Sequence, residues 1–319
     1  MFNSTSKSWV EKYRPDSLKK VTSQKNVINS LKNVAKEKNV PHLIFFGPSG
    51  CGKTSTILAL AKDIFKEEFH NRTIELNASD ERGISVIRNK IKKYAKFSVN
   101  SKNKSIPKWK LIILDEADSM TGESQCALRR IMEEYSYITR FCIICNYHNK
   151  IIDPIVSRCS LFRFKPIDKK SIFNKLKEIS KLENVKINEN DINKITEISR
   201  GDLRKAINFL QKFKSISSNI TLDELAGYIN ITKLENWLQK CINKEDKIIF
   251  EFTNKFFNDG YSLVNQIINI KNLIITNKEL NDKKKCIIII KLMEIDQNLI
   301  KGCDEYIQFL KLGYYIANN

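Results

Sequence analysis

The sequence predicts an α/β domain with a parallel sheet, followed by a small helical domain and an all-α domain. Two observations predict this architecture. The first half of the chain alternates helical stretches with short apolar runs, at residues 42–46, 73–76, 110–114 and 141–145. Buried runs separated by helices are typical of a parallel sheet covered on both faces. After residue 168 the apolar residues recur only at helical spacing. We therefore expect three domains in the 319 residues, at 1–167, 168–230 and 231–319.

Helices are expected between the strands and throughout the second half. In the first domain they fall near residues 54–65, 84–97 and 123–135. The spacing of Ile172, Leu176 and Ile179 then begins a pattern that predicts a three-helix domain. Further helices follow to the end of the chain. Their apolar residues, such as Trp237 and Phe256, exceed what an isolated bundle needs, so they form either a bundle core or a packing interface.

Charge and composition limit the classes of partner. Lys and Arg outnumber Asp and Glu by 55 to 36, for a formal net charge of +19, and such a field favours polyanions, above all nucleic acid. The alternative is that a chain rich in Lys, Asn and Ile throughout reflects an AT-rich coding genome. No apolar run is long enough to cross a bilayer, and residues 1–10 lack the apolar core of a secretory signal. We therefore expect an intracellular protein with no membrane partner.

The cysteines suggest neither a metal site nor a disulfide framework. Of the 8 in the chain, Cys142 and Cys145 form a C-x-x-C pair. The pair lies inside the apolar run 141–145, and neither a second pair nor a His cluster lies at zinc spacing. We expect reduced cysteines in a buried strand.

A glycine-rich loop between the first apolar run and the first helix carries the clearest chemical signal. Residues 47–54 fit G-x-x-x-x-G-K-[ST], in the strand–loop–helix context that the motif requires. Its glycines let backbone N–H groups turn toward a phosphate, and the helix start adds the positive end of its dipole. Lys53 would then contact the β- and γ-phosphates of ATP, and Thr54 would bind Mg²⁺.

The third apolar run ends in acidic residues. Asp115 at the strand tip is suited to the Mg²⁺ shell, and Glu116 to polarising a water that attacks the γ-phosphate. A solvated acidic turn is the alternative interpretation. It does not explain why the acidic residues fall next to the expected phosphate loop. The string 115–118 also occurs in DEAD-box helicases, which need two sheet domains where this chain has one. The acidic pair therefore predicts ATP hydrolysis.

Further motifs make a resemblance to a known family specific. They are, in chain order, Trp9-Val10-Glu11-Lys12-Tyr13-Arg14-Pro15, Leu76-Asn77-Ala78-Ser79-Asp80-Glu81-Arg82-Gly83, Ser157-Arg158-Cys159 and Gly201-Asp202-Leu203-Arg204. With the phosphate loop and the acidic strand they span residues 9–210, and they resemble the small subunits of replication factor C, the AAA+ loader of sliding clamps onto DNA. The resemblance implies a RecA-like AAA+ domain, a small helical lid and an all-α collar domain for oligomerisation.

The resemblance implies an ATP site built from several segments. Asn146 would orient the attacking water as a sensor, although an Asn at a strand end is also a turn former. Arg204 would reach the same ATP from the lid, and a surface Arg at a helix start is the alternative. The expected ATP-binding residues are Val10, Arg14, Thr22, Gly47, Pro48, Ser49, Gly50, Cys51, Gly52, Lys53, Thr54, Ser55, Asn146 and Arg204.

Arg158 has a different implied role, as an arginine finger that completes the ATP site of a neighbouring subunit. A planar, permanently charged guanidinium suits the spread charge of a phosphoryl transition state. The expected catalytic residues are therefore Lys53, Asp115 and Glu116, with Arg158 acting in trans. The monomer should hydrolyse ATP poorly.

A basic helix is the expected DNA contact. Arg88, Lys92 and Lys96 lie four residues apart on the face opposite the sheet, and they could follow phosphates without reading bases. A solvated charged face is the common alternative, and the resemblance favours DNA. On the next helix, Arg129 or Arg130 could touch DNA and restrain the acidic pair, or could form core-edge salt bridges.

Two positions depart from the phosphate loop of the family. Ser49 and Cys51 replace the commoner Pro and Thr, at positions that contribute only backbone, so ATP binding should survive. Cys51 would make the site sensitive to thiol oxidation.

These expectations combine into a function. We expect an ATPase subunit, active only within a heteropentamer of replication factor C subunits. With ATP and Mg²⁺ it would help load the sliding clamp (proliferating cell nuclear antigen) onto primer–template DNA, in the nucleus, during replication and repair. Two alternatives remain open: a shared subunit of an alternative clamp loader or unloader in checkpoint signalling, and a mainly structural ATP-binding arm. A non-replicative AAA+ helicase is disfavoured by residues 157–159 and by the collar-like ending.

Overall fold

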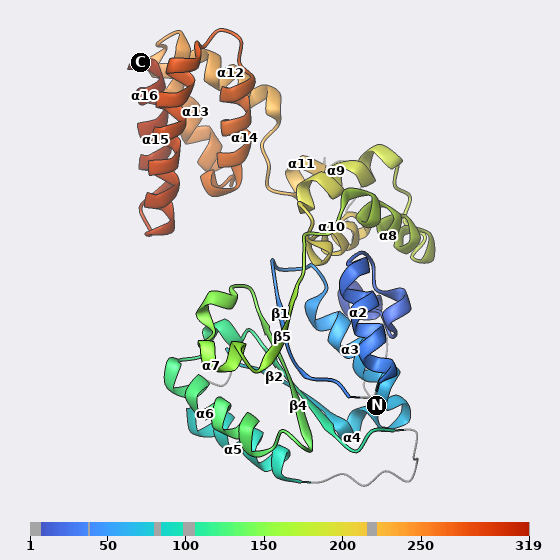
Figure 1. The fold of residues 1–319 in the computed structure, drawn as a ribbon. Helices are drawn as coiled ribbons and strands as arrows, with labels where there is room; N and C mark the ends of the chain where they lie inside the picture. The colour runs from blue at the N-terminus through green and yellow to red at the C-terminus, as the bar shows by residue number, and fades with distance from the viewer. Residues whose placement is uncertain (1–7, 38, 80–83, 98–105, 216–221, 319) are drawn as a thin grey trace. The chain divides into compact units, whose positions relative to one another are not determined.

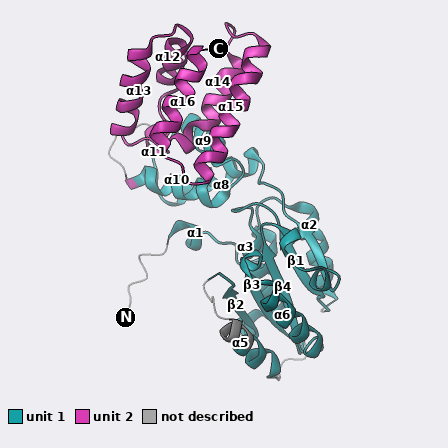
Figure 2. Ribbon diagram, turned by 90° about the vertical axis from the view of Figure 1, so that its left-hand side faces the viewer, with its two compact units in different colours: residues 1–214 teal, residues 215–319 magenta. Residues whose placement is uncertain are grey.

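The chain divides into two compact units, residues 1–214 and residues 215–319 (Figure 2). The structure is a computed structural model that describes residues 8–37, 39–79, 84–97, 106–215 and 222–318. The predicted boundaries of three domains, at 167 and 230, remain a prediction.

Unit 1 is built on a five-stranded parallel sheet with the strand order β2-β3-β4-β1-β5 (Figure 1). The strands are β1 His42–Phe46, β2 Thr73–Asn77, β3 Lys110–Asp115, β4 Thr139–Cys145 and β5 Cys159–Arg163. The sequence predicted the first four, including the buried strand with Cys142 and Cys145. It missed β5, because this edge strand is only half covered and lacks a continuous apolar run.

Alternate residues of the central strands enter two different cores. Leu43, Phe45 and Ile113 pack with helices α2 (Lys25–Lys36) and α3 (Lys53–Phe65). On the opposite face, Ile44, Ile112 and Ile143 pack with α5 (Ile84–Lys96) and α6 (Gly122–Glu134). The sheet is therefore covered on both sides, as expected of parallel strands (Figure 1).

Three helices complete unit 1 after the sheet. They are α8 Lys169–Leu182, α9 Glu189–Ser199 and α10 Leu203–Ser215, the last of which runs one residue past the division between the units. Their buried faces carry the residues whose spacing predicted them, among them Ile172, Leu176 and Ile179. Short helices connect the larger elements: α1 Trp9–Lys12, α4 Phe69–Arg72 and α7 Asp153–Val156, with 3₁₀ turns at Leu18–Lys20, Lys66–Glu68, Ala117–Ser119 and His148–Lys150.

In the residues described, unit 2 is entirely helical. Its elements are α11 Leu222–Leu225, α12 Ile231–Ile242, α13 Asp246–Asn258, α14 Leu263–Thr276, α15 Asp282–Ile300 and α16 Glu305–Asn318. Trp237 and Phe256 are buried in its core, whereas Phe250 and Ile290 are exposed. The apolar excess of this region therefore serves a bundle core in part and leaves apolar side chains on the surface as well. Among the residues described, no helix is long and apolar enough to cross a membrane.

Candidate active site

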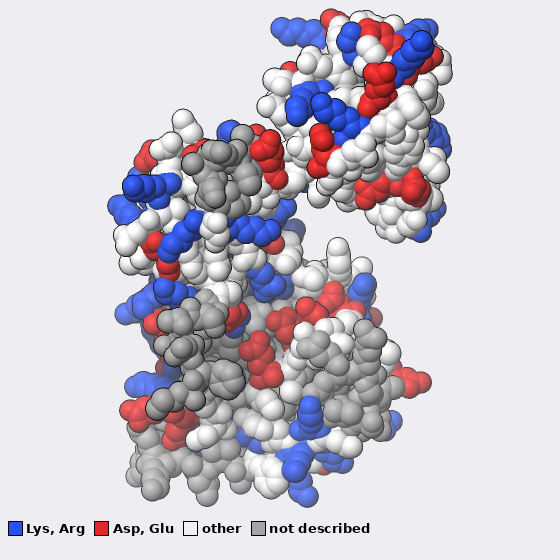
Figure 3. Space-filling view, turned by 180° about the vertical axis from the view of Figure 1, so that it is seen from behind, with Lys and Arg blue, Asp and Glu red and all other residues white. Residues whose placement is uncertain are grey.

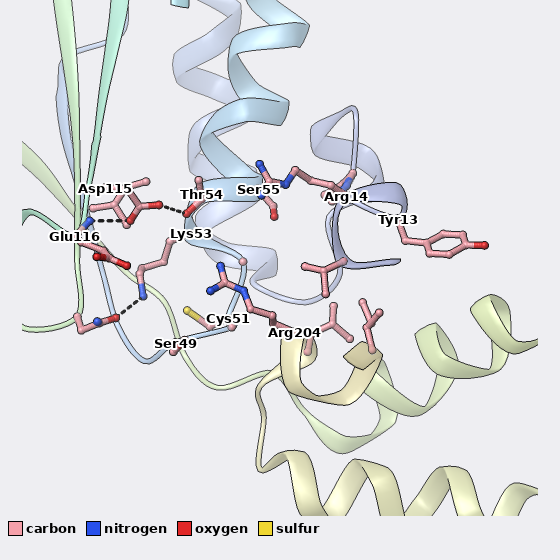
Figure 4. A pocket seen from close by; sticks show the side chains of 18 of the residues that line it. Tyr13, Arg14, Ser49, Cys51, Lys53, Thr54, Ser55, Asp115, Glu116 and Arg204 are labelled. Atoms are coloured by element: carbon pink, nitrogen blue, oxygen red, sulfur yellow. Dashed lines mark hydrogen bonds between the residues drawn. The ribbon is translucent and has the colours of Figure 1, made fainter. Parts of the chain in front are cut away.

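A pocket of unit 1 collects residues from four of the sequence motifs (Figure 4). It lies where β1, β3 and β4 end, the edge at which parallel α/β sheets bind ligands. It is lined by Val10, Tyr13, Arg14, Pro15, Ser49, Gly50, Cys51, Gly52, Lys53, Thr54, Ser55, Asp115, Glu116, Ile144, Cys145, Asn146, Leu203, Arg204 and Ile207. We call the part around residues 47–55, 115–116 and 146 the phosphate-loop end, and the part around residues 10–15 the segment end.

Lys53 is held in place by the loop that precedes it. Its ammonium donates hydrogen bonds to the carbonyl oxygens of Gly47 and Pro48, at 2.7 and 2.8 Å, and to Oδ1 of Asn146 at 3.0 Å. The side chain is buried although it lines the pocket. The amine is therefore preorganised at the mouth of the loop, beside the residue predicted to be the sensor.

The acidic strand ends next to the start of helix α3. The hydroxyl of Thr54 donates to Oδ2 of Asp115 at 2.6 Å, and the backbone N–H of Glu116 donates to Oδ1 of the same carboxylate at 2.9 Å. Glu116 has a φ of 54°, a left-handed conformation that is uncommon for a residue with a side chain. This turn leaves Glu116 exposed at the pocket, while Asp115 stays half-buried against Thr54.

The third helix after the sheet meets the phosphate loop directly. The backbone N–H of Leu203 donates to the carbonyl oxygen of Gly50 at 3.2 Å. Gly50 has a φ of +65°, and a Cβ there would come within 1.7 Å of the Asp202 carboxylate. That carboxylate accepts the N–H of Lys205 at 2.9 Å at the start of α10. Arg204 thereby reaches the pocket from α10 and points toward the phosphate loop (Figure 4).

The segment end is formed by residues that precede the sheet. Val10 and Arg14 line the pocket as expected, and Arg14 is paired with Glu11 at 2.6 Å. Tyr13 and Pro15 were not foreseen, although they belong to the same motif.

Apolar residues of other elements were also missed, namely Ile144, Cys145, Leu203 and Ile207. The last two flank Arg204 on α10, and that helical spacing was the available signal.

Three expected ATP-binding residues do not line the pocket. Gly47 and Pro48 contribute through the carbonyl groups that hold Lys53. Thr22 lies in the connection between the turn Leu18–Lys20 and α2, and its predicted role stays a prediction.

The expectation that Cys51 makes the site sensitive to oxidation is not supported. Cys51 is buried, and its thiol donates to the carbonyl oxygen of Pro48 at 2.9 Å. Burial raises the pKa of the thiol, which lowers the fraction of reactive thiolate. The residue acts as a packed part of the loop.

Arg158 lies outside this pocket, in the turn between α7 and β5. Its guanidinium donates to the carbonyl oxygen of Pro154 at 2.7 Å and pairs with Glu133 of α6 at 2.6 Å. The side chain remains 41% exposed. Arg129 pairs with the same carboxylate at 3.4 Å, which favours the salt-bridge interpretation of that residue.

The basic helix α5 presents lysines to solvent. Lys92 and Lys96 are exposed, and Ile91 and Ala95 are buried against the sheet, as the predicted helix face requires. The side chain of Arg88 lies outside the described part of the structure. On the face shown in Figure 3, Lys and Arg are dispersed among Asp and Glu.

Three family profiles match consecutive parts of the chain. Residues 43–167 match the ATPase family associated with various cellular activities (AAA). Residues 174–214 match the RCF1/5-like AAA+ ATPase lid domain, and residues 229–313 match the replication factor C C-terminal domain.

Three relatives that align with 95% of this chain are named as subunits of replication factor C. Replication factor C subunit 2 of Saccharomyces cerevisiae is 42% identical, over 95% of this chain and 91% of that protein. Replication factor C subunit 4 of Homo sapiens is 43% identical, over 95% and 86%. The replication factor C small subunit of Thermofilum pendens is 41% identical, over 95% and 94%.

Among solved structures, the chain is similar to the Holliday junction branch migration motor RuvB of Thermotoga maritima. The TM-score is 0.52 at 17% identity, over 72% of this chain and 79% of that one. This likeness concerns the fold alone, and with the family profiles it confirms the expected AAA+ architecture.

Proposed function

The chain belongs to the replication factor C family of AAA+ ATPases, and on that premise we propose that it is an ATP-hydrolysing subunit of a clamp loader. The complex would open a sliding clamp and place it on primer–template DNA. One observation carries the proposal: Lys53, Asp115 and Arg204, which come from three separate motifs, line a single pocket. The family relationship supplies the setting, and the pocket supplies the chemistry.

Nucleotide binding begins at the phosphate-loop end. Lys53 is already oriented by two carbonyl oxygens and by Asn146, so its charge would meet the β- and γ-phosphates with little reorganisation. The hydroxyl of Thr54 and the carboxylate of Asp115 are hard oxygen ligands 2.6 Å apart, which suits Mg²⁺. Bound Mg²⁺ would neutralise charge on the phosphates.

Hydrolysis would then depend on Glu116 and Asn146. Glu116 is exposed in the pocket one residue beyond Asp115, the proposed Mg²⁺ ligand, where its carboxylate could accept a proton from an attacking water. Asn146 directly follows the neighbouring strand β4 and could orient that water through its amide.

The position of the lid, helices α8–α10, would depend on the state of the nucleotide through contacts of α10. Arg204 lines the pocket, and Leu203 beside it is hydrogen-bonded to Gly50 of the loop. A phosphate that attracts Arg204 therefore pulls on a helix that already contacts the loop. Closure of the lid would follow the presence of the γ-phosphate.

Arg158 would act on the next subunit of the complex. Arg158 does not line the pocket of its own chain, is partly exposed, and is held at both ends of its guanidinium by Pro154 and Glu133. Such a charged group on the surface fits a finger that stabilises a transition state in trans, a role that contributes about 10³–10⁵ in rate.

DNA and the clamp complete the proposed set of partners. Lys92 and Lys96, with Arg88, would contact the phosphates of the duplex without reading bases. In a eukaryotic cell the protein would work in the nucleus, during replication and repair. Imaging of a fluorescent fusion protein tests the nuclear location.

The decisive experiment is a steady-state ATPase assay of the purified chain, alone and with its partner subunits. Each sample is measured with and without the sliding clamp and primed DNA. We expect weak activity alone and a sharp rise only when partners, clamp and primed DNA are all present. Strong activity of the isolated chain, indifferent to the clamp, would instead indicate a self-sufficient AAA+ enzyme.

The Arg158→Ala variant tests the role in trans within the same assay. ATP binding to this chain should be unchanged, while hydrolysis at the neighbouring site falls by about 10³–10⁵. Arg163→Ala, which removes an exposed arginine at the end of β5, serves as the matched control. Loss of ATP binding to this chain, with normal hydrolysis at the neighbour, would exclude the finger.

A further inference from the structure

The N-terminal segment, residues 8–15, is attached to the lid by side chains. Helix α1 within it presents Val10 to the pocket, and the backbone N–H of Trp9 donates to Oε1 of Gln211 on α10 at 3.1 Å. The ammonium of Lys214, also on α10, lies 5.2 Å from the centre of the Trp9 ring. These contacts join residues about two hundred positions apart in the sequence.

Glu183 is the centre of this attachment. It caps the C-terminus of α8, and its carboxylate accepts hydrogen bonds from Lys12 at 2.6 Å, from the Tyr13 hydroxyl at 2.7 Å and from Lys214 at 3.1 Å. Its side chain is only 10% exposed. One carboxylate therefore connects the segment, α8 and α10.

The geometry points to Glu183 as a positioning residue that holds the N-terminal segment closed over the segment end of the pocket. Tyr13 belongs to both sites, because it lines the pocket and donates to Glu183. In Figure 4 its ring extends away from Lys53 and Thr54, toward the lid side of the segment. The inference rests on the proposed function, since it assigns to this residue the retention of ATP.

Charge explains why the carboxylate matters more than any one of its donors. Lys12 and Lys214 both contact Glu183 within 3.1 Å. The hydrogen bonds from Lys12 and Tyr13 hold the pKa of Glu183 at about 2, so the carboxylate is ionised throughout the physiological range. Without it, two ammonium groups would face each other and the Tyr13 hydroxyl would lose its acceptor. An attraction between segment and lid would become a repulsion.

For nucleotide to leave the pocket past residues 8–15, the N-terminal segment would first have to separate from Glu183 and Gln211. The contacts are specific to the end of the pocket that lies away from Asp115 and Glu116 (Figure 4). They should retain the base and ribose of ATP and leave the affinity for the phosphates alone. This separates a positioning role from general support of the fold.

The experiment measures release of a fluorescent N-methylanthraniloyl-ATP from the purified chain, chased with excess ATP. Glu183→Gln keeps the shape and removes the charge, and we expect release to accelerate about tenfold, as for the loss of charge-assisted hydrogen bonds. Inorganic tripolyphosphate, which lacks base and ribose, should bind to Glu183→Gln and to the unmodified chain with the same affinity, as measured by its competition with the fluorescent nucleotide. Trypsin cleavage after Lys12, without nucleotide, should also accelerate.

Glu189→Ala is the matched control, because this lid glutamate pairs with Lys177 at 2.6 Å and is exposed. Its release rate should equal that of the unmodified chain. If Glu183→Gln proves unstable, Tyr13→Phe removes the hydrogen bond to Glu183 and Gln211→Ala removes the acceptor of the Trp9 N–H, and each should accelerate release a few-fold.

The outcomes separate this inference from the proposed function. If the unmodified chain does not bind the nucleotide, both are overturned. If it binds, and Glu183→Gln folds but releases nucleotide at the normal rate, only the inference fails. An equal loss of affinity for ATP and tripolyphosphate would likewise overturn it, because that would indicate a purely structural effect.

Discussion

The two ends of the pocket are built in different ways. At the phosphate-loop end, Lys53 is positioned by main-chain carbonyl groups and by Asn146 at the tip of a central strand. At the segment end, the N-terminal segment, residues 8–15, is attached to the lid by the side chains of Glu183 and Gln211, which accept from Tyr13 and Trp9. One end depends on backbone geometry, and the other on a few individual side chains.

This difference teaches which part of the site can vary and which part can move. Ser49 and Cys51 stand where commoner residues are expected in the loop, and we expect ATP binding to tolerate them because the proposed phosphate contacts come from the backbone. The N-terminal segment lies outside the sheet, and a small number of polar contacts attach it to the lid, so we expect it to open when these contacts break. We therefore expect hydrolysis to depend on the rigid end, and release of nucleotide to depend on the adjustable end.

The largest expected effect is on hydrolysis at the rigid end. Glu116→Gln retains the shape of the side chain and removes the base, so hydrolysis in the assembled complex should fall by about 10²–10⁴. ATP affinity should stay within about twofold, because the Lys53 contacts are intact. Single-turnover hydrolysis and equilibrium binding measure the two separately.

Glu123→Gln, an exposed residue at the start of α6, is the control for this substitution. Unchanged clamp loading by Glu116→Gln would favour the structural-arm alternative over the ATPase.

A smaller effect is expected where the loop meets the lid. Gly50→Ala would force a side chain into a left-handed backbone position and against the Asp202 carboxylate. The left-handed conformation costs about 1–2 kcal/mol, so ATP affinity should fall about tenfold. Isothermal titration calorimetry measures the change.

Gly122→Ala is the matched control, since a Cβ there meets nothing within 4 Å. Equal affinities for both glycine variants would mean that the contact between Gly50 and the lid does not constrain the loop.

The smallest effect is expected from modification of Cys51. Iodoacetamide at neutral pH should label the exposed Cys126, Cys286 and Cys303 and leave Cys51 intact, because burial raises the pKa of that thiol. ATP binding should remain within about twofold of that of the untreated protein. Mass spectrometry of tryptic peptides identifies the labelled sites.

Labelling of Cys51 together with loss of ATP binding would restore the oxidation hypothesis. It would also show that the phosphate-loop end opens more readily than its contacts suggest.

Much of the rigid end could be predicted from the sequence. The phosphate motif is local, and the acidic strand that ends at Asp115 and the strand before Asn146 are continuous apolar runs. Parallel strands bring their carboxyl ends to one edge, so the motifs had to meet. The edge strand β5 was not predicted, because none of its five residues is fully buried and no continuous apolar run marks it.

The position of Arg204 needed the resemblance as well as the residues. Nothing in the residues next to an arginine at a helix start indicates which group that arginine contacts. The structure shows why Arg204 reaches the pocket. The backbone N–H of Leu203 is hydrogen-bonded to the carbonyl oxygen of Gly50, which holds the start of α10 against the phosphate loop.

Local sequence patterns predicted four of the five strands of the described sheet, their parallel arrangement and the residues that we propose bind phosphate. Each of these depends on patterns within a few residues, which the periods of strands and helices make visible. Tertiary structure alone decided that Tyr13 lines the pocket, that Cys51 is shielded, and that Glu183 joins the N-terminal segment to the lid. Contacts between the N-terminal segment and the lid join residues up to 202 positions apart, and no local pattern encodes them because they arise only when distant elements pack together.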